Sequence, residues 1–182
     1  MDAMILAAGL GTRLRPLTNR IPKALVPVGD RPMLARVADR LVEAGADRLI
    51  VNVHHHADRV VDFLEGWARP GVEVRVSREE PRVLETGGGL KHARDHFRRD
   101  APFFLHNVDV ISTVDLRALY AAHLEAARRD ASPLATLVVS DRDTSRPLLF
   151  DDEGLYGHGM RDGTTRTVRE PVGPSRAVGF AG

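Results

Sequence analysis

The stretch that decides the fold is Leu6-Ala-Ala-Gly-Leu-Gly-Thr-Arg-Leu-Arg-Pro-Leu-Thr18, which is followed by Pro22-Lys23-Ala24. An apolar run leads into a glycine turn, and this turn carries the cations Arg13, Arg15 and Lys23. Glycine lets backbone N–H groups approach an anion closely, and successive N–H groups in a turn form an anion-binding nest. Arginine and lysine side chains around such a nest suit a polyphosphate better than a single carboxylate. The stretch therefore predicts a strand that ends in a phosphate-binding loop.

Composition indicates an ordinary globular protein: 182 residues, 43% of them hydrophobic and 28% charged. The formal net charge of +1 gives no overall attraction to nucleic acid or to a membrane surface. The chain has no cysteine, so disulfides and thiolate metal sites are excluded. No apolar run is long enough to span a membrane, and a signal-peptide pattern is missing. We therefore expect a cytoplasmic protein that binds neither nucleic acid nor membrane.

The hydrophobic pattern along the chain alternates between strand and helix. Expected strands cover residues 4–8, 48–53, 72–76, 103–105 and 134–139, and expected helices cover residues 32–44, 57–67, 90–97 and 114–128. The continuous apolar strand 48–53 indicates burial on both faces, whereas alternation in 72–76 indicates a place near a sheet edge. This order predicts an α/β, Rossmann-like fold with a mostly parallel sheet and helices on both faces.

Residues 141–182 differ, because short strand candidates alternate there with turn residues. The chain stops at Phe180-Ala181-Gly182, in the middle of an apolar strand pattern that would leave a sheet edge unprotected. We therefore expect a fragment, or an unusually short version, of a longer domain that is truncated at its carboxyl end.

Two common phosphate-binding motifs do not fit the glycine turn. A dinucleotide fingerprint requires a third glycine where this chain has Leu14, and a P-loop requires a Gly-Lys-Ser/Thr sequence that does not follow. The two glycines alone would indicate no more than a structural turn.

Residues 6–18, with Pro22-Lys23-Ala24-Leu25-Val26-Pro27-Val28, resemble the amino-terminal motif of the sugar-phosphate nucleotidyltransferases: Leu-Ala-Ala-Gly-x-Gly-Thr-Arg-Leu-x-Pro-Leu-Thr, then Pro-Lys-x-Leu. Pro32 and Leu34 also stand in the family's places. The resemblance implies that a nucleoside triphosphate and a sugar 1-phosphate give a nucleoside diphosphate sugar and pyrophosphate. It also implies one domain over residues 1–182, with a nucleotide-binding core in 1–140 and the start of the sugar-binding part in 141–182.

The resemblance assigns roles to residues of the first loop. Nucleotide contacts are implied for Leu6, Ala8, Gly9, Gly11, Thr12 and Arg13. Arg13 would hold the departing phosphates, and Lys23 would neutralise charge at the α-phosphate and the sugar phosphate. These catalytic roles agree with the chemistry, since phosphoryl transfer depends mainly on alignment and on stabilisation of charge.

Asp109 is the second candidate catalytic residue, because it follows the carboxyl end of a strand, where open parallel sheets bind ligands. From spacing alone, a turn or helix-capping aspartate is the plainer interpretation. The family motif at this point, Asn-x-Asp, matches Asn107-Val108-Asp109 and implies that Asp109 binds Mg²⁺ and that Asn107 contacts the nucleotide. Val108 is bulkier than the family's usual small residue and is expected to narrow the pocket.

A second glycine segment, Leu84-Glu-Thr-Gly-Gly-Gly-Leu90, is expected to be a loop that opens a helix. By itself it is weak evidence and fits a flexible turn. It resembles the family loop that reads the base, which implies nucleotide contacts from Glu85, Gly87 and Gly88. Its form looks most like the N-acetylmuramic acid 1-phosphate uridylyltransferases and the mannose 1-phosphate guanylyltransferases, so UTP or GTP is the expected nucleotide.

Other motifs carry less weight. Glu170-Pro171 resembles a Glu-Lys-Pro segment of the family without its lysine, which implies that Glu170 contacts the sugar. His54-His55-His56 is expected to be a solvated loop and not a metal site, because consecutive side chains point in different directions. The pairs Arg98-Arg99 and Arg128-Arg129 are expected at helix ends.

These observations predict a Mg²⁺-dependent sugar 1-phosphate nucleotidyltransferase. In the family a second magnesium-binding aspartate follows a strand like 177–181, and this chain has no such residue. A nucleotide-binding fragment or regulatory relative without turnover is therefore the main alternative, and a phosphocholine cytidylyltransferase-like enzyme is another. A homo-oligomer is left open.

Overall fold

The computed structural model describes residues 1–129 and 133–181. The chain divides into two compact units, Met1–Ser132 and Pro133–Gly182. The first unit thus ends before residue 140, where we expected the nucleotide-binding core to end. The assignment of both units to one nucleotidyltransferase domain stays a prediction.

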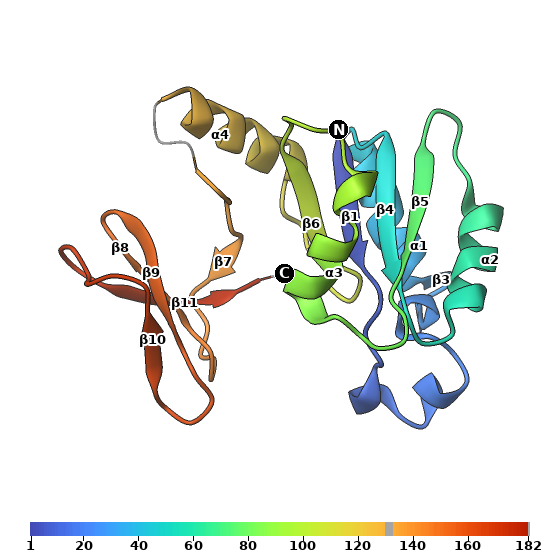
Figure 1. Ribbon diagram of the computed structural model, residues 1–182, viewed down its shortest axis with the longest axis horizontal. Helices are drawn as coiled ribbons and strands as arrows, with labels where there is room; N and C mark the ends of the chain where they lie inside the picture. Colours follow the sequence, from blue (N-terminus) through green and yellow to red (C-terminus); the bar gives the residue numbers. More distant parts are fainter. Residues whose placement is uncertain (130–132, 182) are drawn as a thin grey trace. The chain divides into compact units, whose positions relative to one another are not determined.

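A parallel sheet forms the centre of the first unit, with the strand order β5-β4-β1-β6. Its strands are β1 (Asp2–Leu6), β4 (Arg48–Val53), β5 (Glu73–Arg78) and β6 (Phe103–Asn107). Each neighbouring pair is parallel, so all four carboxyl ends lie at one edge, next to the loop that follows β1 (Figure 1). As predicted, β4 is buried and β5 lies at the sheet edge.

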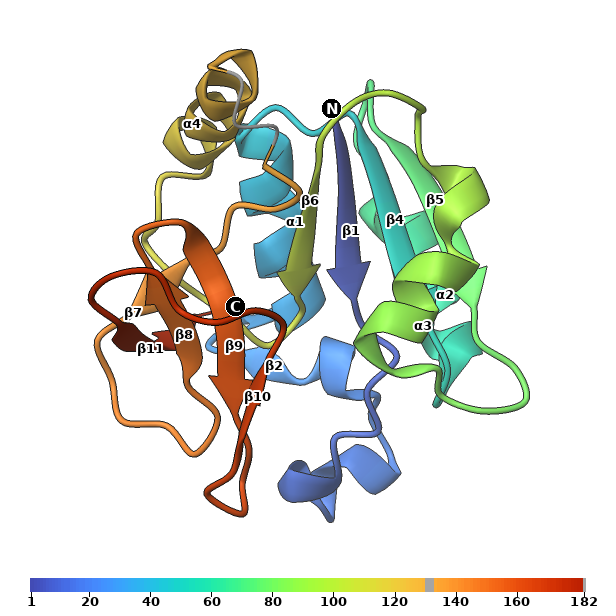
Figure 2. The same cartoon turned by 60° about the vertical axis from the view of Figure 1, so that its left-hand side comes forward.

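Helices cover both faces of this sheet. They are α1 (Met33–Glu43), α2 (Ala57–Trp67), α3 (Glu85–His92) and α4 (Leu116–Arg128). One core cluster packs α1, α2 and α4 against one face through side chains such as Leu41, Leu64 and Leu116. Met4 and Ile50 point to the opposite face, where the α3 side of the chain covers them (Figure 2). The predicted α/β fold is confirmed.

The second unit is an antiparallel sheet with the strand order β10-β9-β8-β11-β7. Its strands are β7 (Val139–Ser140), β8 (Leu148–Asp151), β9 (Gly154–Gly159), β10 (Thr165–Thr167) and β11 (Arg176–Phe180). A small antiparallel pair, β2 (Pro27–Val28) and β3 (Arg31–Pro32), belongs to the first unit. Short strands are present after residue 141, as expected.

The expected strand at residues 134–139 is wrong for most of its length. Only Val139 and Ser140 form a strand, and they pair antiparallel with β11. One further bond, from the Ala181 N–H to the Val138 carbonyl at 2.9 Å, lies beside this pair, and Leu134 is fully exposed. An apolar run becomes a strand only where a neighbouring strand supplies a continuous ladder of hydrogen bonds, and β11 supplies that ladder at residues 139–140 alone.

The second glycine segment is also different from the prediction, because α3 already begins at Glu85. Gly87, Gly88 and Gly89 therefore lie inside a helix and not in a loop before it. The helix ends at His92, before Ala93 and Phe97, which we expected within it. Each helical glycine costs about 1 kcal/mol relative to alanine, so this run requires a structural or functional reason.

Within the described residues, no helix is long and apolar enough to cross a membrane.

An ion-pair network lies near the amino ends of the strands. Arg98 and the amino-terminal ammonium contact Asp47 at 2.6 and 2.8 Å. Arg75 and Arg48 each contact Glu73 at 2.7 Å. The hydrogen bond from Arg98, and then that from the amino terminus, holds the pKa of Asp47 well below its usual range. Arg75 and Arg48 lower the pKa of Glu73 in the same way.

This network predicts acid sensitivity. A carboxylate whose pKa is lowered by folding stabilises the protein above its unfolded-state pKa of about 4, and this stabilisation is lost as the pH falls below that value. The Tm should therefore fall as the pH is lowered from about 5 to about 2, and Asp47→Asn should lower the Tm near neutrality and flatten the fall. Calorimetric scans at each pH measure this, with Asp100→Asn, on an exposed aspartate, as the matched control. Equal slopes for wild type and Asp47→Asn would contradict the role of Asp47.

Candidate functional site

The loop after β1 is built around Gly11 and Thr18. Gly11 has φ +62°, in the left-handed region, and a Cβ there would lie 2.8 Å from Thr18 Cγ2. The Thr18 hydroxyl is buried and donates to the Gly11 carbonyl at 2.8 Å. Single turns of 3₁₀ helix at Thr12–Leu14, Leu17–Asn19 and Lys23–Leu25 complete the loop. Glycine at residue 11 is therefore required by the shape of the loop.

Lys23 and Asp109 come together across the first unit, although 86 residues separate them in sequence. Lys23 Nζ donates a hydrogen bond to Asp109 Oδ2. The Lys23 side chain is only 17% exposed and that of Asp109 is 37% exposed, so the lysine is the more buried of the two partners. This ion pair joins the loop after β1 to the segment after β6, which are the two places where the sequence predicts charged catalytic groups.

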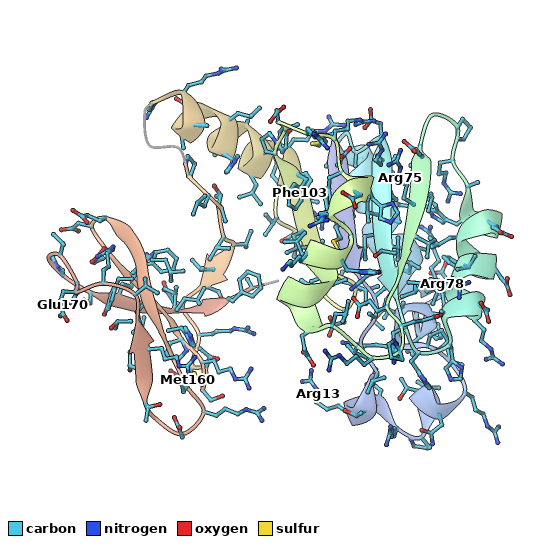
Figure 3. The ribbon with its side chains drawn as sticks, viewed as in Figure 1. Arg13, Arg75, Arg78, Phe103, Met160 and Glu170 are labelled. Atoms are coloured by element: carbon cyan, nitrogen blue, oxygen red, sulfur yellow. The ribbon has the colours of Figure 1, made fainter. Side chains whose placement is uncertain are left out.

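The remaining predicted residues of the first loop differ in their exposure to solvent. Thr12 and Arg13 are exposed, and Arg13 extends away from its loop (Figure 3). Within the part of the chain that the structure describes, no acidic group pairs with Arg13, so its charge is available to a ligand. Gly9 is exposed, and no atom lies within 4 Å of the position that a Cβ would take there. Its backbone is thus open to a close approach, while Ala8 before it is buried.

Leu6 and Asn107 are direct neighbours in the sheet, since β1 and β6 place them opposite each other. Asn107 is half-buried, and Val108 is 2% exposed within the core cluster of the first unit. The expectation that Val108 narrows the pocket is therefore wrong, because its side chain packs in the core at the turn that follows β6. His106 contacts the Asn107 carbonyl through Nδ1 at 2.7 Å, and burial lowers the pKa of its imidazole.

The three glycines of α3 have different surroundings. A Cβ at Gly87 would meet nothing within 4 Å, and Gly87 is exposed. A Cβ at Gly88 would lie 3.0 Å from Leu84 Cβ, and one at Gly89 would lie 2.5 Å from Glu79 Oε1. Before them, Glu85 is exposed and has φ +60°, a backbone conformation that residues other than glycine rarely adopt. Gly87 is therefore open to a ligand, whereas Gly89 is required by packing.

Two residues outside the predicted site connect the glycine segments. Asn52, on β4, accepts a hydrogen bond from the Ala7 N–H and donates one to Glu79, each at 2.7 Å. The second oxygen of Glu79 accepts the Leu84 N–H, also at 2.7 Å. Both side chains are buried. The signal that could have found them is an asparagine inside an apolar strand and a glutamate directly after another strand, both expected to need partners.

A magnesium ion fits Asp109 only in part. In residues 1–129 and 133–181, no group of three or more His, Asp or Glu side chains is placed to hold a metal. The Asp109 carboxylate is exposed and pairs with Lys23 through one oxygen, so it could serve as a single hard ligand. Mg²⁺ commonly takes one or two carboxylates together with substrate phosphates. The histidines 54–56 lie outside any such group, and His54 contacts the Glu79 carbonyl through Nδ1.

Glu170 belongs to the second unit. Beside it, Arg169 donates through both terminal nitrogens to Asp151, each at 2.6 Å, and the Asp151 side chain is fully buried. Asp151 also accepts the Val172 N–H at 2.7 Å. These bonds fasten the segment around Glu170 to the end of β8, while the Glu170 side chain stays exposed (Figure 3).

The contrast between Gly11 and Gly9 predicts that alanine at these two positions changes the stability of the protein to different extents. Gly11→Ala should lower the free energy of unfolding by at least about 1–2 kcal/mol, because alanine is strained in the left-handed region and its Cβ would contact Thr18. Gly9→Ala should change it by less than about 1 kcal/mol, because the Cβ enters open space. Equilibrium urea unfolding of both variants provides the comparison. Similar losses in the two variants would contradict this account of the loop.

Comparison with known proteins agrees with these features. The model of the nucleotidyl transferase family matches residues 2–146. The chain is 47% identical over 111 residues to the N-acetylmuramate alpha-1-phosphate uridylyltransferase of Caulobacter vibrioides, a match that covers 60% of this chain and 46% of that protein. It is 36% identical over 161 residues to the mannose-1-phosphate guanyltransferase of Candida albicans, covering 83% of this chain and 44% of that protein.

Solved structures show the same similarity. HddC from Yersinia pseudotuberculosis, crystallised with GMP-PN, aligns with a TM-score of 0.65 and 25% identity, covering 99% of this chain and 73% of that one. A putative glucose-1-phosphate thymidylyltransferase from Bacillus anthracis has the same fold, with a TM-score of 0.71, 19% identity, and coverage of 99% of this chain and 70% of that one. The chain spans less than half the length of the two curated relatives. Because the family model matches most of the chain, this protein belongs to the nucleotidyl transferase family.

Proposed function

We propose that this chain provides the nucleotide-binding and catalytic part of an enzyme that transfers a nucleotidyl group from a nucleoside triphosphate to a sugar 1-phosphate. The observation that supports this most is the ion pair between Lys23 and Asp109. It joins a cation from the first glycine loop to a carboxylate beyond β6, and the same loop has open backbone at Gly9. An anionic substrate and a hard cation can both be bound by such a pair.

In the proposed reaction, an oxygen of the sugar phosphate attacks the α-phosphorus of the triphosphate in line with the leaving group. The new P–O bond forms as the bond from the α-phosphorus to the bridging oxygen breaks, and pyrophosphate leaves with that electron pair. No covalent intermediate on the protein and no proton transfer is required. The protein therefore has to align two polyanions and stabilise the charge that develops between them.

The residues of the first unit are assigned roles on this basis. Asp109 would hold Mg²⁺ together with substrate phosphates, and the bound ion would offset phosphate charge. Lys23 would turn from Asp109 toward the α-phosphate and the sugar phosphate. Arg13, which has no acidic partner among the described residues, would hold the departing pyrophosphate. Backbone N–H groups near Gly9 and Gly87 would contact the nucleotide, since both positions are open.

For the substrates, we propose UTP with N-acetylmuramic acid 1-phosphate as the first pair to test. The relative at 47% identity is a uridylyltransferase for that sugar phosphate. GTP with mannose 1-phosphate is the second pair, because the relative at 36% identity is a mannose-1-phosphate guanyltransferase. Glu170 is proposed to contact the sugar. The residues on both sides of it, Arg169 and Val172, are hydrogen-bonded to Asp151.

The test is release of pyrophosphate from the purified chain with Mg²⁺, each common nucleoside triphosphate and a panel of sugar 1-phosphates and phosphocholine. Release with one pair identifies both substrates, and removal of Mg²⁺ with EDTA should abolish it. Nucleotide binding without release from any pair would instead favour a nucleotide-binding protein without turnover. Absence of both binding and release would refute the proposed function.

Lys23→Ala should reduce kcat by about 100-fold or more, because a group that stabilises developing charge in the transition state is removed. The fold should be retained, since the lost bond is a partly exposed ion pair whose loss costs little. Lys91→Ala, in the last turn of α3, removes the chain's other lysine and serves as the matched control. Wild-type kcat in Lys23→Ala, with the control also unchanged, would contradict the catalytic role of Lys23.

A further inference from the structure

Glu79 is a fully buried acidic residue that the proposed chemistry does not use. Its exposed fraction is 0%, and within the described ranges no arginine, lysine or histidine side chain forms an ion pair with it. A buried carboxylate is costly unless its oxygens are hydrogen-bonded. Glu79 receives this compensation from Asn52 and from the Leu84 N–H. The cost indicates that the carboxylate does something that an apolar residue could not do.

The direction of the hydrogen bonds shows why a carboxylate is needed. The backbone N–H groups of Ala7 and Leu84 stand at the two ends of the chain of bonds, and each can only donate. Asn52 accepts from Ala7 with its oxygen and therefore offers its amino group to Glu79. Both oxygens of Glu79 must then accept. A glutamine has one accepting oxygen, so it would leave a donor facing a donor.

The two backbone donors at the ends of this series of hydrogen bonds, Ala7 and Leu84, belong to the two glycine segments. Ala7 follows β1 and precedes the open Gly9, whereas Leu84 directly precedes α3 with its open Gly87. Figure 2 shows the chain from β5 returning to the first turn of α3, beside the loop that leaves β1. A displacement of either segment would therefore break one of the bonds to Asn52 or Glu79.

At Gly89, helix α3 packs directly against Glu79 and Asn52. A Cβ at this position would lie 2.5 Å from Glu79 Oε1 and 2.9 Å from Asn52 Nδ2. Contacts this short are not tolerated, so only glycine allows the helix to lie this close. Gly89 is thus required by packing against the hydrogen-bonded pair Asn52 and Glu79, and not for access of a ligand.

We propose that Glu79 is a positioning residue that, through Asn52, holds the glycine segments at residues 6–11 and 84–89 at the spacing that the nucleotide requires. This inference rests on the proposed function for its ligand, a nucleoside triphosphate. Glu79 itself contacts no substrate. Its removal should weaken nucleotide binding through both segments and leave the sugar phosphate much less affected.

The test uses four variants of the full chain. Glu79→Gln and Asn52→Asp each introduce one mismatched pair of groups. The double variant Asn52→Asp/Glu79→Gln exchanges carboxylate and amide. The carboxylate at position 52 would then accept from the Ala7 N–H and from the amide nitrogen at position 79, while the amide oxygen at position 79 would accept from Leu84. This exchange restores every bond at unchanged net charge. Glu80→Gln, on the adjacent exposed glutamate, is the matched control.

Glu79→Gln and Asn52→Asp should each raise the KM for the nucleoside triphosphate by about tenfold or more, with a change below about threefold in the KM for the sugar 1-phosphate. The double variant should return to within about threefold of the wild type, and Glu80→Gln should not differ from it. A purely structural role would shift both KM values together. If a single variant fails to fold, the double variant decides: failure of the exchange to restore folding and KM would overturn the proposal.

Hydrogen exchange of the Ala7 and Leu84 amides, followed by NMR in the protein without nucleotide, separates this proposal from the proposed function. Both amides should exchange faster in Glu79→Gln and return to slow exchange in the double variant. If the wild type neither binds nor turns over a nucleotide, the proposed function fails, and the exchange rates still decide whether Glu79 couples the two segments. Unchanged exchange in Glu79→Gln would overturn the coupling.

Discussion

Two backbone N–H groups at the carboxyl edge of the parallel sheet, those of Ala7 and Leu84, are satisfied by side chains and not by the strand ladder. Backbone donors that are shielded from water must be paired. Here Asn52 accepts from Ala7 and Glu79 accepts from Leu84, and the two side chains are hydrogen-bonded to each other. The rest of the candidate site depends on this arrangement, because it sets where the chain leaves β1 and where α3 begins. Gly89 is explained by the same constraint, since a side chain there would overlap Glu79.

The glycines around this edge of the sheet fall into two groups, according to whether a side chain would fit at their position. Gly11 and Gly89 are required by the packing of the protein, one by its left-handed backbone beside Thr18 and the other by Glu79. Gly9 and Gly87 have empty space where a side chain would stand. Sites that bring backbone N–H groups against phosphate or a base need such open positions. Each of the two segments thus contains one open glycine.

Several features were predictable from the sequence because they depend on local pattern. The helical spacing of apolar residues in 32–44 and 57–67 corresponds closely to α1 and α2, and the continuous apolar run at 48–53 corresponds to β4. The expected strand at 134–139 was wrong because an apolar run carries no information about a partner strand. The prediction for Val108 was wrong because its bulk suggested a pocket wall, whereas its side chain packs in the core.

The sequence by itself determined the α/β fold and the family, since a long motif around residues 6–28 and the alternation of strands and helices are both written along the chain. Only the tertiary structure decided which charged groups meet. Lys23 and Asp109 pair because parallel strands bring the ends of β1 and β6 to one edge. Asn52 and Glu79 connect the two glycine segments for the same reason. Hydrogen bonds between residues far apart in sequence depend on the register of neighbouring strands, and no local pattern records that register.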